Sequence, residues 1–234
     1  MVPLSDDNLA RKTPYITYVI IGINIWVFWH QINLPESDIN QFFQLFAVVP
    51  KSLSESFQGI NTNPTFPEQW TLITSQFLHG GFLHLAGNML YLWIFGNNVE
   101  DRLGHFRYLL FYLACGALAA LSQWYFSPQS PIPIVGASGA IAGVMGAYII
   151  RFPHAQILTL IPLGFFITTI RLPAIFFLGF WFAQQAFFSF ASLNLLGDSA
   201  AVQSGGVAYW AHAGGFVFGI ILGPLLGLFY NRDR

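Results

Sequence analysis

Five polar side chains that can do acid–base or nucleophilic chemistry lie in or beside strongly apolar stretches of the sequence. His79, His84 and Asn88 cluster around the start of one stretch, Ser138 opens another, and His212 opens the last. Ionisable groups are costly inside a bilayer, so those found there are candidates for function. A serine hydroxyl becomes a strong nucleophile when a neighbouring base takes its proton, and histidine is the commonest such base. The set therefore predicts acyl transfer by Ser138, with His212 as its base.

The composition places these residues in a membrane. Of the 234 residues, 55% are hydrophobic and only 8% are charged, whereas a soluble domain is roughly 25% charged. The net charge of −1 also lacks the excess of basic groups that nucleic-acid binding requires. The sequence therefore predicts an integral membrane protein that contacts lipid and binds no nucleic acid.

Six stretches approach the roughly 20 apolar residues that a helix needs to cross a bilayer. They cover residues 13–32, 82–99, 106–126, 135–152, 172–193 and 207–230. A seventh stretch, residues 155–170, is shorter and is interrupted by Pro162 and Gly164, so it fits either a short span or a surface loop. With six spans, eight of the nine Lys and Arg residues lie on the cytoplasmic side. With a seventh span, five would lie on the cytoplasmic side and four on the outer side. The positive-inside rule therefore favours six spans with both termini cytoplasmic.

This topology divides the chain into three parts. Residues 1–12 form a cytoplasmic segment, residues 13–230 the membrane domain, and residues 231–234 a cytoplasmic tail. No small-residue cleavage site follows the first apolar stretch, so we expect a retained anchor. Residues 33–78 mix polar residues with apolar clusters and are expected to form an outer loop half-sunk in the membrane. The predicted fold class is an all-α membrane protein.

The topology also gives the polar residues a common depth. The second, fourth and sixth spans run from outside to inside, so the ends that carry His84, Ser138 and His212 lie in one layer near the outer surface. Small residues recur along the fourth and sixth spans and would let the two helix backbones touch. They are Gly136, Ala137, Gly139, Gly143, Gly146, Ala211, Gly215, Gly219 and Gly223. Such packing would bring the Ser138 hydroxyl within reach of the His212 ring.

The other polar residues at this depth fit supporting roles. His84 and Asn88 share one helix face and could donate N–H groups to an oxyanion beside the Ser138 amide. No Asp or Glu lies at this depth to orient the base, so the sequence supports a dyad rather than a triad. His79 fits either the site or a hydrogen bond that anchors the preceding loop. The supporting candidates are His79, Gly136 and Gly139.

A zinc site made of His79, His84 and His212 is an alternative for these side chains. It lacks a carboxylate or thiol at the same depth, and the sequence has no His-Glu-x-x-His motif. Taken alone, Ser138 would more often bond back to a carbonyl one turn earlier in its own helix. Its pairing with His212 favours catalysis, and we expect no metal ion and no cofactor.

Four ordered motifs surround these residues. They are GASGA around Ser138, AHAGG around His212, FLHGGFLHLAGN with His79, His84 and Asn88, and FGNNVEDRLG with Gly96, Glu100 and Gly104. Together they resemble the rhomboid family of intramembrane serine proteases. The likeness continues through Trp181 and Gln184 in GFWFAQQ, and it covers about residues 70–219. A lone GASG would be a weak signal, whereas four motifs in this order are specific.

The resemblance implies a rhomboid-like bundle of six transmembrane helices and a proteolytic function. Ser138 would attack a peptide bond near the outer end of a single-span substrate's transmembrane helix, with His212 as general base and then acid. His84, Asn88 and the Ser138 amide would bind the oxyanion. Glu100 and its surroundings, including Arg102, would be structural. The compact form is what we expect in a bacterial plasma membrane.

The sequence departs from the family pattern at two positions. Ala142 stands where some members carry an aromatic residue packed on the catalytic histidine, so another group must hold the His212 ring. Thr71 follows Trp70 where many members have arginine. The alternative function is a non-catalytic rhomboid-like protein that binds or escorts transmembrane helices, or a small channel-like protein. Such proteins usually lose the serine or the histidine, and this chain keeps both.

Overall fold

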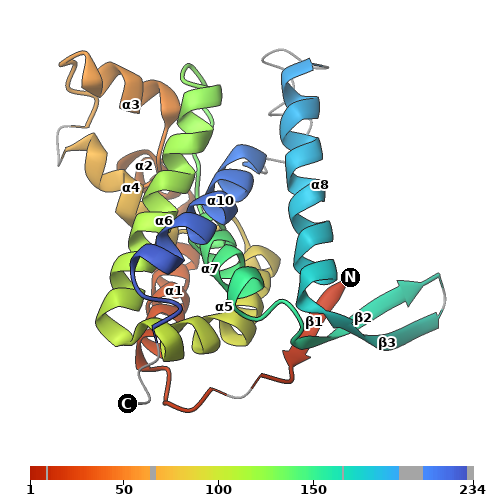
Figure 1. Ribbon diagram of the computed structural model, residues 1–234. Helices are drawn as coiled ribbons and strands as arrows, with labels where there is room; N and C mark the ends of the chain where they lie inside the picture. The colour runs from red at the N-terminus through yellow and green to blue at the C-terminus, as the bar shows by residue number, and fades with distance from the viewer. Residues whose placement is uncertain (9, 64–66, 165, 195–207, 231–234) are drawn as a thin grey trace.

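The computed structural model describes residues 1–8, 10–63, 67–164, 166–194 and 208–230 (Figure 1). Within these ranges, the six longest helices coincide with the six predicted stretches. They are α1 (Tyr15–Ile32), α5 (Phe82–Leu103), α6 (His105–Phe126), α7 (Ser138–Arg151), α8 (Ala174–Asn194) and α10 (Tyr209–Leu225). The helical character of the predicted all-α fold is therefore confirmed. The predicted tail, residues 231–234, lies outside the described residues.

Three helices have the length and hydropathy of a membrane span by themselves. They are α1, α6 and residues Ala174–Ser192 of α8. The helices α7 and α10 are apolar but shorter, with 14 and 17 residues. The protein is thus a membrane protein with a helical bundle, while the full count of six spans and the cytoplasmic location of both termini stay predictions.

Helix α7 lies at the centre of the bundle, and α5, α6, α8 and α10 pack around it (Figure 1). Every residue from Gly139 to Tyr148 is buried. The core beside it is largely aromatic, with Phe95, Tyr108 and Tyr112 fully buried. Residues of α7 are therefore held by protein on all sides rather than by lipid.

The backbones of α7 and α10 touch directly, because glycines face each other along the contact. A Cβ atom at Gly215 would overlap the carbonyl oxygen of Gly139, and one at Gly219 would overlap that of Gly143. On the other helix, a Cβ at Gly146 would meet the carbonyl oxygen of Phe216. The predicted packing of these two helices through small residues is confirmed.

Glu100, near the end of α5, holds the start of α1. Its side chain is 1% exposed, and its oxygens accept hydrogen bonds from the amides of Ile16 (2.9 Å) and Thr17 (2.8 Å) and from the Thr17 hydroxyl (2.7 Å). A carboxylate at the first amides of a helix pairs free donors and interacts favourably with the helix dipole. His105 contacts the same carboxylate at 2.6 Å. Glu100 therefore braces α1 against α5, which is a structural role of the kind that the resemblance implied.

The chain also forms a small sheet, which the all-α prediction missed. The strands β1 (Val2–Asp6), β2 (Gln156–Leu163) and β3 (Phe166–Pro173) are antiparallel in the order β1-β2-β3. The apolar stretch 155–170 is therefore a hairpin rather than a seventh helix. Its β-branched residues favour strands, and Gly164 supplies the left-handed turn with φ +64°. The N-terminal segment, expected only to be polar, contributes the third strand.

The predicted outer loop, residues 33–78, contains three helices. Among its described residues they are the α-helices α2 (Glu36–Phe46), α3 (Pro50–Phe57) and α4 (Thr71–Thr74), and the 3₁₀ turns Glu68–Trp70 and Ser75–Phe77 flank α4. The loop packs against α6, and Val48 pairs with Ile134 just ahead of α7. The loop therefore supports the segment that leads into Ser138. Its half-sunk position in the membrane stays a prediction.

Asp6 at the end of β1 is bound to two helices of the bundle. Its carboxylate accepts hydrogen bonds from the Tyr148 hydroxyl of α7 and from the Asn98 amide of α5, the latter at 2.9 Å. Burial raises the pKa of Asp6 from 3.8 to about 6, an effect that the neighbouring carboxylate of Asp7 reinforces and these hydrogen bonds oppose. The first strand is therefore tied to the bundle by a group that titrates near neutral pH.

Replacing Gly215 by alanine should destabilise the bundle, because the new methyl group would push α7 and α10 apart. Overpacking of this kind costs about 1–3 kcal/mol. Gly179→Ala on α8 is the matched control, since no described atom outside the backbone of its own helix turn lies within 4 Å of the position its Cβ would take. Thermal unfolding in detergent should show a lower midpoint for Gly215→Ala alone. Equal midpoints for the two variants would contradict the backbone contact.

The stability of the protein should depend on pH through Asp6. The pKa of Asp6 is raised in the folded protein, so protonation of this carboxyl group favours folding. The stabilisation is complete below about pH 4 and is lost as pH rises through 6. Asp6→Asn mimics the protonated group at every pH. The difference in unfolding midpoint between this variant and wild type should grow between pH 4 and 7.5. A difference that stays constant over this range would show that Asp6 does not titrate there.

Candidate active site

Ser138 is the first residue of α7, and a tight turn before the helix sets its place. The Gly136 amide donates to the Ser75 carbonyl oxygen at 2.9 Å, which fixes this turn to the end of the outer loop. Gly136 has a φ of +119°, a conformation that residues with a side chain rarely adopt. The serine hydroxyl therefore projects from a helix terminus that is anchored to the outer loop.

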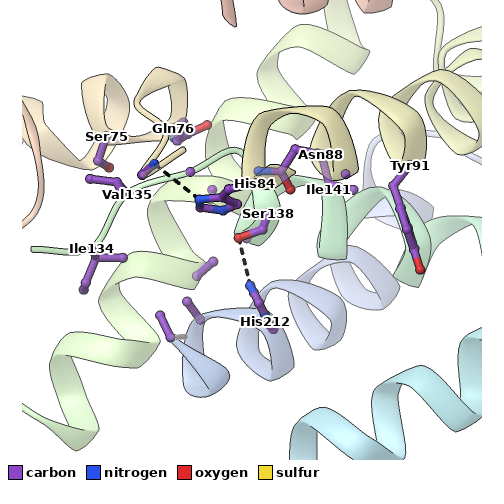
Figure 2. A pocket seen from close by; sticks show the side chains of 18 of the residues that line it. Ser75, Gln76, His84, Asn88, Tyr91, Ile134, Val135, Ser138, Ile141 and His212 are labelled. Carbon is purple, nitrogen blue, oxygen red and sulfur yellow. Dashed lines mark hydrogen bonds between the residues drawn. The ribbon is translucent and has the colours of Figure 1, made fainter. Parts of the chain in front are cut away.

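His212, in the first turn of α10, meets this serine. Its Nε2 atom lies 2.8 Å from the Ser138 Oγ (Figure 2), although the two residues are 74 positions apart in the chain. The glycine contact between α7 and α10 begins immediately beyond, at Gly139 and Gly215. The structure thus brings together Ser138 and His212, which the sequence analysis placed at the same depth in the membrane.

Gln185 of α8 holds the other side of the His212 ring. Its Oε1 atom lies 2.9 Å from the His212 Nδ1, and the Gln185 side chain is 8% exposed. An amide oxygen only accepts hydrogen bonds, so Nδ1 carries the proton and Nε2 is free to accept the serine proton. The Trp181 ring lies 5.9 Å from the imidazole, centroid to centroid. These groups replace the aromatic neighbour that Ala142 lacks.

The sequence reasoning missed Gln185. The resemblance pointed to Trp181 and to the adjacent Gln184, which is exposed on α8. Gln185 lies four residues after Trp181 and four before the buried Ser189, so the three share a helix face. The sequence signal that could have identified Gln185 is its four-residue spacing from Ser189, which puts two polar residues on one face of an apolar helix.

His84 and Asn88 lie one turn apart on α5 and face the same cavity as Ser138 (Figure 2). The Gly80 amide donates to the His84 Nδ1 at 3.4 Å, so the neutral ring carries its proton on Nε2. This Nε2 points toward Gly136, because a Cβ there would lie 2.8 Å from it. The Asn88 Nδ2 is buried and has no hydrogen-bond partner among the described residues. Both side chains therefore offer N–H groups beside the serine.

His79 stands behind His84 rather than in the cavity. Its ring meets the His84 ring edge-on at 5.1 Å, and the Gln31 side chain binds its backbone through both the amide (3.1 Å) and the carbonyl (2.9 Å). It therefore anchors the loop and packs against His84. Gly139 serves packing as well, since a Cβ there would lie 2.6 Å from that of Ala119 on α6. Among the described residues, no three His, Cys, Asp or Glu side chains are grouped to hold a metal ion.

A cavity of about 930 Å³ connects these groups. It is bounded by α5, α6, α7, α8 and α10, and its lining includes Ser138, His212, His84, Asn88, Tyr91 and Trp181. A nucleophile paired with a base, next to several N–H donors, has the parts needed for acyl transfer. The cavity therefore holds a serine hydroxyl hydrogen-bonded to a histidine ring, with further N–H donors beside them, inside the helical bundle.

The rhomboid domain model matches residues 67–229, which include every residue of this cavity. The chain therefore belongs to the rhomboid family. Similar proteins include Rhomboid protein 1, mitochondrial, of Saccharomyces cerevisiae, 29% identical over 94% of this chain and 55% of that protein. Two others, both of Bacillus subtilis, are Rhomboid protease GluP (38% identical; 57% of this chain, 24% of that protein) and Putative rhomboid protease YdcA (35% identical; 61% and 65%). The chain spans less than two thirds of the length of each of these relatives.

Gln185→Leu should slow the reaction of Ser138 with a fluorophosphonate by at least about tenfold, because the base loses the acceptor that fixes its tautomer. Gln185→Glu should keep the orientation and shift the acid limb of the pH–rate profile upward, because a carboxylate stabilises the imidazolium. Gln184→Leu, at the exposed neighbour, is the matched control and should react like wild type. Intact-mass kinetics between pH 5 and 9 measure all three. An unchanged rate for Gln185→Leu would refute the orienting role.

Proposed function

We propose that this chain is an intramembrane serine endopeptidase that cleaves single-span membrane proteins near the outer end of their transmembrane helix. The observation that carries the proposal is the 2.8 Å contact between Ser138 Oγ and His212 Nε2 inside a cavity of the helical bundle. A serine that served only packing would not need a buried base with its own acceptor, Gln185. Membership of the rhomboid family supports the same conclusion.

The geometry supports a two-step mechanism. The Ser138 oxygen attacks the carbonyl carbon of the scissile peptide bond while its proton passes to His212 Nε2. The resulting oxyanion is bound by N–H groups of the Ser138 backbone, His84 and Asn88. His212 then gives its proton to the leaving amine, and water, activated by the same histidine, hydrolyses the acyl-enzyme. Gln185 keeps the Nδ1 proton in place throughout.

The location of the site suits a substrate that lies in the membrane. His84, Ser138 and His212 occupy the first turns of α5, α7 and α10, so they lie at one end of the bundle. We assign this end to the outer side, where the positive-inside rule puts it. A transmembrane helix that unwinds there would present its backbone to Ser138. The relatives include a mitochondrial protein and proteins of a bacterium, and a bacterial plasma membrane stays our prediction for this chain.

Fluorophosphonate labelling tests the proposal without knowledge of the substrate. The purified wild-type protein should gain the mass of one adduct, and Ser138→Ala should gain none, because the hydroxyl is the attacked group. His212→Ala should label at a rate lower by about 100-fold or more, since the base is gone. Thermal unfolding of each variant serves as the control for folding.

A second assay then separates labelling from proteolysis. Wild type should cleave a single-span reporter protein in vesicles, and Ser138→Ala should not. Equal cleavage by wild type and Ser138→Ala would refute the dyad. A folded wild type that neither labels nor cleaves would favour the non-catalytic alternative, a protein that binds or escorts transmembrane helices.

A further inference from the structure

The hairpin of β2 and β3 carries an apolar surface that nothing else in the described chain covers. Phe166 is 78% exposed, Ile167 71% and Ile170 38%. The sequence from 161 to 167 contains no polar side chain. An apolar patch of this kind marks a contact with another molecule or with a membrane. Figure 1 shows the hairpin projecting sideways from the foot of α8, beyond the rest of the bundle.

The place of the hairpin in the chain identifies that contact. β3 ends at Pro173, and α8 begins at the next residue, Ala174. Residues Ala174–Ser192 of α8 are long and apolar enough to cross a membrane. The foot of the hairpin is therefore fixed at the boundary of the bilayer that α8 enters. Because the hairpin extends sideways, it runs along this boundary rather than away from it.

The register of the strands shows which face is turned toward the bilayer. Side chains alternate between the two faces of a sheet. Near the foot, Ile157 and Thr159 point into the bundle, and both are fully buried. Thr159 pairs with Ile170, so these two residues share that face, and Thr168 lies two residues farther toward the tip. The sheet face that packs on the helices at the foot thus continues toward the tip of the hairpin, where no described helix covers it.

The opposite face has a different character near the foot. On β3 it carries Thr169 and Arg171, which are both exposed, and their partners on β2 are the half-buried Leu160 and Leu158. A long basic side chain at a membrane boundary can keep its charge among the headgroups while its stem follows apolar surface. The hairpin thus exposes Phe166 and Ile170 on the bundle side, whereas its charged residue, Arg171, lies on the outer side of its foot.

We propose that the β2–β3 hairpin is a membrane-surface anchor that lies in the interface of the bilayer crossed by α8. Phe166 and Ile170 face the acyl chains of that leaflet, and Arg171 lies among the phosphates of its headgroups. The ligand is the phospholipid bilayer itself. The proposal does not depend on catalysis, because it uses none of the residues in the cavity of Ser138.

Two adjacent threonines provide a matched test, because Thr168 and Thr169 differ only in the face they occupy. Cys115 is fully buried, so a nitroxide label attaches only at an introduced cysteine. Thr168→Cys and Thr169→Cys would each be labelled in the full-length protein and placed in phosphatidylcholine–phosphatidylglycerol vesicles. Power saturation should show several-fold more oxygen relative to water-soluble nickel chelate at position 168 than at position 169. A label at position 168 as accessible to the chelate as one at position 169 would overturn the proposal.

A second measurement uses the unmodified protein. A photoactivatable phospholipid with its reactive group in the acyl chain should label peptides from the hairpin as well as peptides from α8. Labelling of α8 without labelling of the hairpin would show that the hairpin lies in water. Because no substitution is involved, this outcome would count against the proposal regardless of how the cysteine variants fold.

Discussion

The direct backbone contact between α7 and α10 is the constraint on which the rest of the structure depends. In lipid, exposed apolar side chains gain little by leaving their surroundings, so helices associate through close packing. Gly143 and Gly219 allow an approach that any side chain would prevent. Ser138 directly precedes one end of this contact, and His212 lies one turn before Gly215 on the other helix. Their hydrogen bond is therefore set by the backbones of two helices, which have far less freedom than two side chains.

The low polarity of the surroundings explains why the base is oriented by an amide. A carboxylate buried beside His212 would have to lose its hydration, which costs several kcal/mol per ion. The Gln185 oxygen fixes the ring through a hydrogen bond and carries no net charge. The unpaired Asn88 amide is the opposite case, because a buried donor without a partner costs about 1–3 kcal/mol. Under the proposed mechanism, the oxyanion relieves this cost only as it forms, which favours the transition state over the ground state.

The sequence predicted the features that follow from local composition. The helices begin and end within a few residues of the apolar stretches, and the common depth of Ser138 and His212 followed from the direction of the spans. The pairing of β1 with β2 was missed because some 150 residues separate them, and pairing between distant segments leaves no local pattern. The β2–β3 hairpin is local, but its apolar stretch fitted a short helical span or a surface loop as well. Whether Gln184 or Gln185 contacts His212 depends on how α8 is rotated about its axis. That rotation is set by packing against α10 and α7, which the sequence of α8 alone does not specify.

The two ends of the bundle are held by different forces, and α8 connects them. At the end away from the cavity, Glu100 and Asp6 bind α1, α5 and α7 through hydrogen bonds to carboxylates. At the cavity end, apolar contacts and glycines hold the helices that carry Ser138 and His212. Helix α8 packs chiefly on α10, and its Gln185 supplies the acceptor for the His212 ring. If the hairpin at its foot is fixed in the membrane surface, it restrains the tilt of α8. The orientation of the His212 ring then depends on how the protein sits in its bilayer. Under the proposed mechanism, this is a physical link between lipid and catalysis.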